Sequence, residues 1–241
     1  MSDNLGTDFR KIDLHVHTPK STCYSEKSTG YEQIVQAAAA AQLDAIAITD
    51  HNTADAIEQI RKIASTQTLV VIPGLELTTA SGHFIAIFDI DTPVSVMNRL
   101  LDDIGVKPAL RGDGAEQIPM ETLDIFQKVH EYGGLIIAAH IERWPSGFLE
   151  SKETRSGKVN IHSSPYLDAL EITVAQNRAQ WENGVVRGYT KKYACVQGSD
   201  AHSPGEVGRR PVYMRLSVIN LAGIKEVFRN WRCNIAFTKE E

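Results

Sequence analysis

The chain alternates short apolar runs with amphipathic stretches along most of its length. Most of the runs are apolar on both faces, which is typical of strands buried within a fold. The runs lie at residues 11–18, 44–51, 68–77, 83–90, 134–140, 168–174, 193–202, 211–216 and 233–237. This alternation predicts an α/β fold with a largely parallel sheet.

Between the runs, apolar residues recur at helical spacing. The spacing predicts helices through residues 31–38, 57–64, 123–129 and 221–231. We expect Asn52 or Thr53 to cap the second of these helices. We expect the third to stop at Gly133 and Gly134, because glycine adopts a left-handed conformation at little cost.

Two stretches interrupt this pattern. Residues 105–118 hold several Gly and Pro breakers, and residues 144–166 form a long polar segment after an apolar run that ends in histidine. A loop as long as residues 144–166 with no secondary structure of its own is uncommon unless it acts as a lid or a binding loop. We find no internal repeat and no linker, so we expect a single domain over residues 1–241.

Composition narrows the class of protein. The chain has 241 residues, 42% of them hydrophobic, and a formal charge of -5, which suits a soluble globular domain. With 30 carboxylates against 25 Lys and Arg, a broad nucleic-acid binding face is not expected. The three cysteines form no disulfide framework, and no apolar run approaches the ~20 residues of a membrane span. We therefore expect a cytoplasmic protein with no membrane contact.

The histidines gather beside the apolar runs. Six of the eight do so: His15, His17, His51, His83, His140 and His202. The first two are two residues apart on an extended chain, so their side chains share one face. Glu76 and Asp200 add carboxylates at strand ends, and the carboxyl ends of a parallel barrel meet at one rim. Because a catalytic zinc ion uses about three protein ligands, this set predicts two or three ions.

Five motifs make the chain recognisable. DLHVHT, ITDHN, GLEL followed by GHF, AAH and GSDAH occur in this order between residues 13 and 202. In these motifs the chain resembles the PHP family, the polymerase and histidinol phosphatase superfamily of metal-dependent phosphoesterases. The resemblance implies a distorted, TIM-like (β/α)7 barrel of the PHP type. It also implies an enzyme, a metal-dependent phosphoric ester hydrolase.

The resemblance further implies a ligand set for each ion. One ion would be held by His15, His17, Glu76 and Asp200. A second would be held by Glu76, His83 and His140, with the Glu76 carboxylate bridging the two ions.

A third ion, where family members have one, would be held by His51 and His202. The family usually supplies a further His or Asp shortly after the first motif, and here the segment STCYS offers Cys23. A thiolate ligand would give this site a softer character. The alternative is an ordinary half-buried thiol.

The chemistry implied is attack on phosphorus by a metal-activated hydroxide at this di- or trinuclear centre. Glu76 and Asp200 would serve it as metal-holding carboxylates. Arg143 is the best placed cation to bind phosphate oxygens, since a guanidinium can engage two of them at once, and the alternative for it is a solvated surface position. Imidazole and carboxylate ligands suit zinc, manganese and iron alike.

We expect the substrate to be a phosphorylated small molecule or a nucleotide. One alternative is a nuclease acting on single-stranded or terminal nucleic acid, which would need a basic groove, and Lys152 to Lys158 offers the best candidate. Another is a noncatalytic domain that contacts a partner such as an ATPase. The sequence gives no prediction of oligomeric state.

Overall fold

Every predicted apolar run overlaps a strand in the computed structural model, which describes residues 8–144 and 147–238. The strands are β1 (Phe9–Val16), β2 (Ala45–Ile48), β3 (Val70–Thr79), β4 (Gly82–Ile87), β5 (Leu135–Ala138), β6 (Ala169–Glu171), β7 (Ala194–Val196), β8 (Val212–Arg215) and β9 (Ile235–Ala236). Their burial is nearly complete from β2 to β7, as expected for strands covered on both faces.

The strands form a nine-stranded sheet in the order β7-β6-β5-β4-β3-β2-β1-β8-β9. A parallel bridge between Val16 and Ala201 joins the end of β1 to the segment that follows β7. Its hydrogen bonds run from His17 N to Ala201 O at 3.0 Å and from Ala201 N to His15 O at 3.3 Å. The sheet is therefore nearly closed on itself, and the predicted distorted α/β barrel is confirmed.

The strand directions are more mixed than the alternation predicted. β1, β2 and β3 pair in parallel, as do β5, β6 and β7. β4 runs antiparallel to both of its neighbours, and β8 pairs antiparallel with β1 and β9. A turn of two residues, 80–81, joins β3 to β4, and so short a connection forces the chain to reverse. The beginning of β4 consequently lies at the same edge as the carboxyl ends of β3 and β5.

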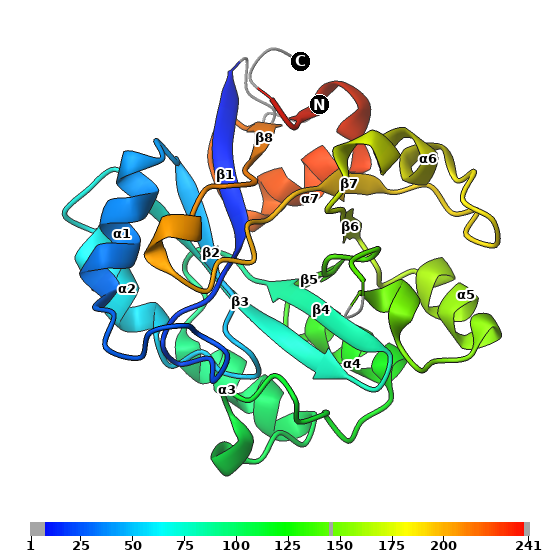
Figure 1. Ribbon diagram of the computed structural model, residues 1–241, viewed down its shortest axis with the longest axis horizontal. Helices are drawn as coiled ribbons and strands as arrows, with labels where there is room; N and C mark the ends of the chain where they lie inside the picture. Colours follow the sequence, from blue (N-terminus) through cyan, green and yellow to red (C-terminus); the bar gives the residue numbers. More distant parts are fainter. Residues whose placement is uncertain (1–7, 145–146, 239–241) are drawn as a thin grey trace.

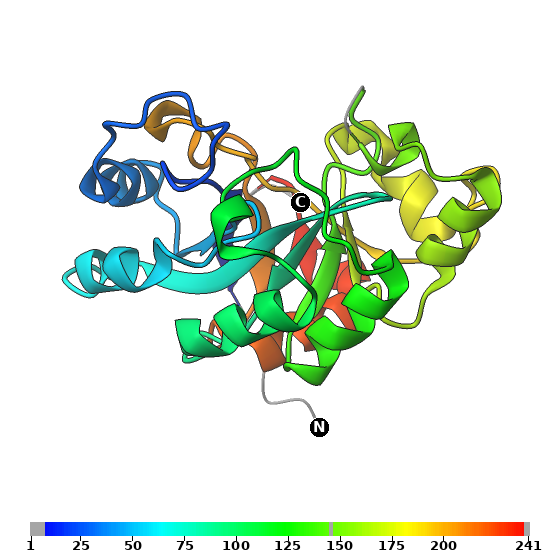
Figure 2. The ribbon, with the colours of Figure 1, turned by 90° about the horizontal axis from the view of Figure 1, so that it is seen from below.

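Helices cover the sheet on several sides (Figure 1). The α-helices are α1 (Tyr31–Ala40), α2 (Ile57–Ala64), α3 (Val94–Asp103), α4 (Thr122–Glu131), α5 (Arg155–Ser163), α6 (Arg178–Asn183) and α7 (Leu221–Arg229). Short 3-10 helices are η1 (Pro108–Leu110), η2 (Phe148–Glu150), η3 (Ala175–Asn177), η4 (Pro204–Glu206) and η5 (Trp231–Cys233). Figures 1 and 2 show α1 and α2 on one flank and α5 and α6 on the other, with α3 and α4 against the sheet.

The four predicted helices correspond to α1, α2, α4 and α7. Gly133, just after α4, has a φ of 82°, as the predicted stop requires. The cap predicted for α2 is wrong, because the helix begins after Ala56 and Asn52 is engaged elsewhere. The helices α3, α5 and α6 were not predicted.

The segment 144–166 is more ordered than its polar sequence suggested. It contains η2 and α5, although residues 145 and 146 lie outside the described part. Thr154 caps α5, with its hydroxyl accepting a hydrogen bond from Gly157 N at 3.0 Å. Ile161 and His162 near the end of the helix are buried, so packing holds a segment whose own helical pattern is weak.

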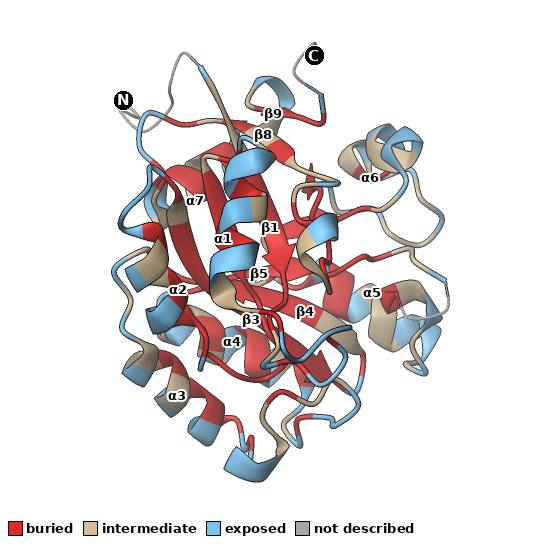
Figure 3. Ribbon diagram, turned by 60° about the vertical axis from the view of Figure 1, so that its left-hand side comes forward, coloured by how far each residue is buried: buried red, intermediate tan, exposed pale blue. Residues whose placement is uncertain are grey.

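Buried apolar side chains form one continuous core (Figure 3). The strands are buried along most of their length, whereas the helices turn an exposed face outward. Among helices of the described residues, none has the length and apolar character that a membrane span needs. That the whole chain is one domain stays a prediction.

Candidate metal centre

The predicted histidines and acids converge at one end of the barrel. They come from β1 and its end (His15, His17), the ends of β2, β5 and β7 (His51, His140, Asp200, His202), β3 (Glu76) and the start of β4 (His83). Their imidazole rings lie side by side, with centroid separations from 4.3 to 5.8 Å. His83 joins them only because β4 runs antiparallel, which the rule about carboxyl ends does not anticipate.

One group of four has the spacing of ligands around a single ion. His15 Nε2 lies 3.1 Å from His17 Nε2 and 3.3 Å from both Glu76 Oε2 and Asp200 Oδ1. His17 Nε2 lies 3.1 Å from Glu76 Oε2 and 3.2 Å from Asp200 Oδ1. Ligands about 2.0–2.1 Å from a tetrahedral ion are about 3.3–3.4 Å from each other. These four side chains therefore fit one small divalent cation.

The two oxygens of Glu76 face different histidines. Its Oε2 atom is turned to His15 and His17, and it also lies 3.2 Å from His51 Nδ1. Its Oε1 atom lies 3.1 Å from His83 Nδ1 and 3.2 Å from His140 Nε2. His51, Glu76 and His83 form a second group whose ligand atoms could hold an ion. Because Oε2 faces His15 and His17 while Oε1 faces His83 and His140, this carboxylate is suited to bridging two cations.

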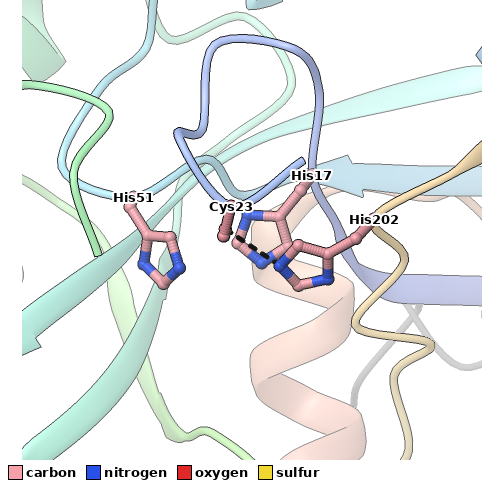
Figure 4. Close-up of side chains that lie close together, drawn as sticks. All are labelled: His17, Cys23, His51 and His202. Carbon is pink, nitrogen blue, oxygen red and sulfur yellow. Dashed lines mark hydrogen bonds between the residues drawn. The ribbon is translucent and has the colours of Figure 1, made fainter. Parts of the chain in front are cut away.

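A third group contains the thiol of Cys23 (Figure 4). Ligand atoms of His17, Cys23, His51 and His202 all lie within 4.8 Å of one another. The closest pair is Cys23 Sγ and His202 Nε2 at 3.0 Å, and the His202 ring stacks on His17. Cys23 therefore faces the cluster, although burial and the nearby carboxylate of Glu76 raise the pKa of its thiol to about 11.

The charges at the centre are strongly coupled. Burial by itself would lower the pKa of His15 and His17, but the neighbouring carboxylates outweigh it: the pKa of His15 lies well above its usual value and that of His17 rises to about 9. Burial would raise the pKa of Glu76 and Asp200, yet the surrounding imidazoles hold both well below their usual values. Two buried carboxylates this close to each other thus require positive charge between them, which protons or metal ions can supply.

One imidazole nitrogen fits a metal ion better than a proton. His51 Nδ1 is buried, and although it lies 3.2 Å from Glu76 Oε2 it forms no hydrogen bond with any described residue. Burial lowers the pKa of His51 to about 3, so this ring is neutral and offers a lone pair. A buried polar atom left without a partner costs free energy, and coordination would remove that cost.

Other side chains orient the rings from behind. Glu171, at the end of β6, lies 2.8 Å from His15 Nδ1, and Ser21 Oγ lies 3.0 Å from His17 Nδ1. Ser21 in turn donates to Asp50 at 2.6 Å. Asp13, which precedes these histidines, instead accepts hydrogen bonds from backbone N–H groups, including those of Ser199 and Gly208. The strand-end position of Glu171 was a weak sequence signal, and Ser21 had none.

The segment 105–118 folds over His51. Gly112 N donates to His51 O at 2.8 Å, and the Asn52 side chain donates to the carbonyl oxygens of Asp113 and Glu116. A Cβ atom on Gly114 would lie 2.6 Å from the His51 ring, so only glycine allows this close approach. The sequence indicated breakers here but not their role of covering a candidate ligand.

Backbone strain also concentrates at the centre. Asn52, His140 and Asp200 all have positive φ, at 50°, 29° and 49°. Each lies two to four residues beyond the end of a strand, where the chain turns into a loop. Strain of this kind persists where surrounding structure enforces it and is common at functional sites.

The predicted phosphate-binding cation lies at this rim. Arg143 forms an ion pair with Asp200 Oδ2, and its side chain is 30% exposed. Arg209 and Arg210 instead donate to the backbone carbonyls of Gly198 to Asp200, so they brace the loop that carries Asp200.

Other polar residues lie away from the cluster. Lys158 donates to Leu149 O at 2.5 Å, and Trp144 is largely exposed. His130 pairs with Asp168 at the opposite end of β6, and His162 is buried among aromatic rings.

Comparisons with known proteins agree with this picture. A family model described as the PHP domain matches residues 13–194. An uncharacterized protein of Methanocaldococcus jannaschii is 26% identical over 220 residues, which cover 88% of this chain and 72% of the relative.

Solved structures share the fold at low identity. A two-domain protein of Bacteroides vulgatus, containing a predicted PHP-like metal-dependent phosphoesterase, has a TM-score of 0.64 at 18% identity, covering 96% of this chain and 67% of its own. An amidohydrolase from Chromobacterium violaceum with bound sulfate and no metal has a TM-score of 0.58 at 16% identity, covering 82% and 89%. A putative metal-dependent phosphoesterase from Bifidobacterium adolescentis reaches 0.50 at 17% identity, covering 80% and 88%. These likenesses show the fold alone.

Proposed function

Since the chain belongs to the PHP domain family, we propose that it is a metal-dependent phosphoesterase that hydrolyses a small phosphomonoester or a nucleotide. The observation that carries the proposal is the convergence of imidazoles and carboxylates at ligand spacing around Glu76. Burying this many polar and charged groups costs free energy unless they are paired or bind metal, and for that reason we favour a metal enzyme over a noncatalytic domain.

We propose two or three divalent ions per chain, which could be zinc, manganese or iron. The first is held by His15, His17, Glu76 and Asp200, the second by Glu76, His83 and His140, and the third by His51, His202 and Cys23. When bound, such ions supply Lewis-acid stabilisation of phosphate oxygens and a water acidic enough to attack phosphorus. The donors support this set, because Glu76 turns one oxygen to each of the first two groups.

The residues of the chain then have distinct roles. Glu76 and Asp200 fix the positions of the ions, while Glu171 and Ser21 hold the His15 and His17 rings in register. Arg143 binds phosphate oxygens at the open side of the centre, where its guanidinium already meets the Asp200 carboxylate. Sulfate resembles phosphate in shape and charge, and its presence in the similarly folded amidohydrolase supports anion binding by this architecture.

The nuclease alternative has less support. It required a basic groove around Lys152 to Lys158, but the Lys158 ammonium group turns to the Leu149 carbonyl. The centre is instead covered by the segment 105–118 on one side and bounded by Arg143 on another. We therefore favour a small substrate over a polymer.

Two wider predictions from the sequence are carried forward as proposals. Cys23, Cys195 and Cys233 are all free thiols, which supports a reducing, cytoplasmic location. The continuous core supports a single domain.

The experiment that tests the function combines metal analysis with turnover. Purified protein loaded in turn with zinc, manganese or iron is assayed on an aryl phosphomonoester, an aryl phosphodiester and a short oligonucleotide. We expect two or three ions per chain by elemental mass spectrometry and hydrolysis of the monoester.

The matched variant is the double change His15→Ala with His17→Ala. It should lose most of the metal and all monoester hydrolysis, while circular dichroism shows a folded chain. Full activity in this variant would remove the proposed mechanism. Faster cleavage of the oligonucleotide than of the monoester would favour the nuclease.

A further inference from the structure

A second polar pocket lies at the opposite end of β6 and β7 from the metal centre. It has a volume of about 390 Å³ and is bounded by the segments that lead into these two strands and by the end of α7. Asp168 directly precedes β6 and Glu171 is its last residue, so the pocket is about 10 Å from the metal centre along the strand. Nothing in the proposed phosphoesterase chemistry uses it.

Positive charge collects around this pocket. Lys191, Lys192, Lys225 and Arg229 all line it, in a chain whose formal charge is -5. Its carboxylate, Asp168, is already engaged, because it accepts a bond from Ile136 N at 2.8 Å and pairs with His130 Nε2 at 2.9 Å.

None of the four cations forms an ion pair with a described carboxylate, and three have no polar partner at all. Lys191 donates to Ser164 O and lies over the Tyr193 ring, but the side chains of Lys192, Lys225 and Arg229 make no ion pair or hydrogen bond with any described residue. The position of Arg229 is explained by α7, because a cation in the last turn of a helix interacts favourably with the helix dipole. Neither Lys192, before β7, nor Lys225, in the middle of α7, has that explanation.

The wall of the pocket also carries aromatic surface. Tyr166, Phe228 and Trp231 line it together with the cations. Cations beside aromatic faces suit an anion that carries a ring.

We propose that this pocket binds a small phosphorylated molecule with a planar ring. Its phosphate is held by Lys192, Lys225 and Arg229, and its ring packs against Tyr166 and Trp231. The site is separate from the metal centre and independent of the proposed hydrolysis.

Residue-resolved lysine labelling tests the proposal on the metal-loaded protein. Acetylation rates of individual lysines are measured by mass spectrometry with inorganic phosphate, with adenosine monophosphate, or with chloride at the same ionic strength. We expect both phosphate compounds to slow labelling of Lys192 and Lys225 severalfold, with the nucleotide acting at lower concentration. Lys62, an exposed lysine on α2, should be unaffected.

Variants separate this site from the metal centre. Lys192→Glu should abolish the protection of Lys225 while leaving hydrolysis of the aryl phosphate unchanged, and the charge-matched control Lys62→Glu should keep the protection. Labelling rates equal to those in chloride would overturn the proposal. Equal potency of phosphate and nucleotide would overturn the ring contact. Loss of protection in Arg143→Ala, with Lys192 intact, would assign the effect to the metal centre instead.

Discussion

Buried histidines occur in two contrasting regions of this molecule. His15 and His17 at the rim and His162 near the end of α5 are all fully inaccessible to solvent. The first two lie within 3.3 Å of carboxylate oxygens of Glu76 and Asp200. His162 instead has no hydrogen-bond partner on either ring nitrogen among the described residues, and it lies among Trp181, Tyr189 and Tyr193 at centroid separations of 5.8, 5.1 and 5.0 Å.

The two environments move the histidine pKa in opposite directions. Carboxylates raise it at the rim despite burial, whereas burial lowers the pKa of His162 to about 4, with a further contribution from Lys191. Burial alone therefore does not distinguish a candidate ligand from a packed side chain. A candidate ligand differs from a packed side chain in having buried carboxylates next to it, because these carboxylates favour a positive charge at that place.

We expect the largest effect from neutralising Glu76, the carboxylate that five histidines of the rim face. Glu76→Gln keeps the shape of the side chain but removes its charge from both oxygen positions. Because breaking a buried charged cluster costs about 3–5 kcal/mol, we expect metal affinity to fall on the order of a hundredfold or more. Elemental analysis after dialysis measures the loss. His162→Phe serves as the control and should retain all its metal; equal retention by Glu76→Gln would contradict the bridging role.

A smaller effect is expected from the carboxylate behind His15. Glu171→Gln weakens the bond that fixes the ring and its tautomer, and such changes lower metal affinity by about 10–100-fold. Competition with a chromophoric chelator measures the affinity. The matched control is Asp168→Asn at the other end of β6, which removes the acid paired with His130 and should leave metal binding unchanged. Equal effects of the two variants would mean that Glu171 has only a structural role.

Arg143 tests whether the rim also recognises substrate. Losing a charged hydrogen bond costs about 1.5–3 kcal/mol, so Arg143→Ala should reduce kcat/KM by about 10–100-fold while metal content stays constant. Arg143→Lys should recover part of the loss, since an ammonium group keeps the charge but not the paired donors. Unchanged kinetics in the alanine variant would mean that Arg143 is a solvated surface residue that does not contact the substrate.

The smallest effect concerns stability and acid. The unfolded chain protonates His162 near pH 6.5 and the folded protein only near pH 4, so the unfolded state binds more protons between these values. Stability from this residue is therefore complete above pH 6.5 and falls as the pH drops toward 4, by about 1 kcal/mol at about pH 5.5. Urea unfolding of His162→Phe should lack this part of the pH dependence. If the free energies of unfolding of His162→Phe and wild type differ by the same amount at pH 7.5 and pH 5.5, the folded protein does not lower the pKa of His162. That result would show that the ring has a partner.

The sequence predicted the strands better than the helices. Buried strands carry their signal in a few consecutive apolar residues, so every run was found. Helix α5 was missed because its sequence is polar, and the contacts that hold Ile161 and His162 come from distant elements. The direction of β4 was missed because most of this antiparallel strand is buried on both faces, so its continuous apolar run resembles that of a parallel strand.

By itself the sequence determined the chemistry available to this protein: its imidazoles, carboxylates and thiol are placed in ordered motifs beside strands, because residue type and local spacing are written in the chain. Only the tertiary structure decided which atoms meet. The reversal of β4 brings His83 to the rim, closure of the sheet sets β1 against the segment of Asp200, and Gly114 lets a loop lie on His51. These juxtapositions join residues far apart in sequence, so they depend on how the whole sheet twists and closes rather than on any local preference.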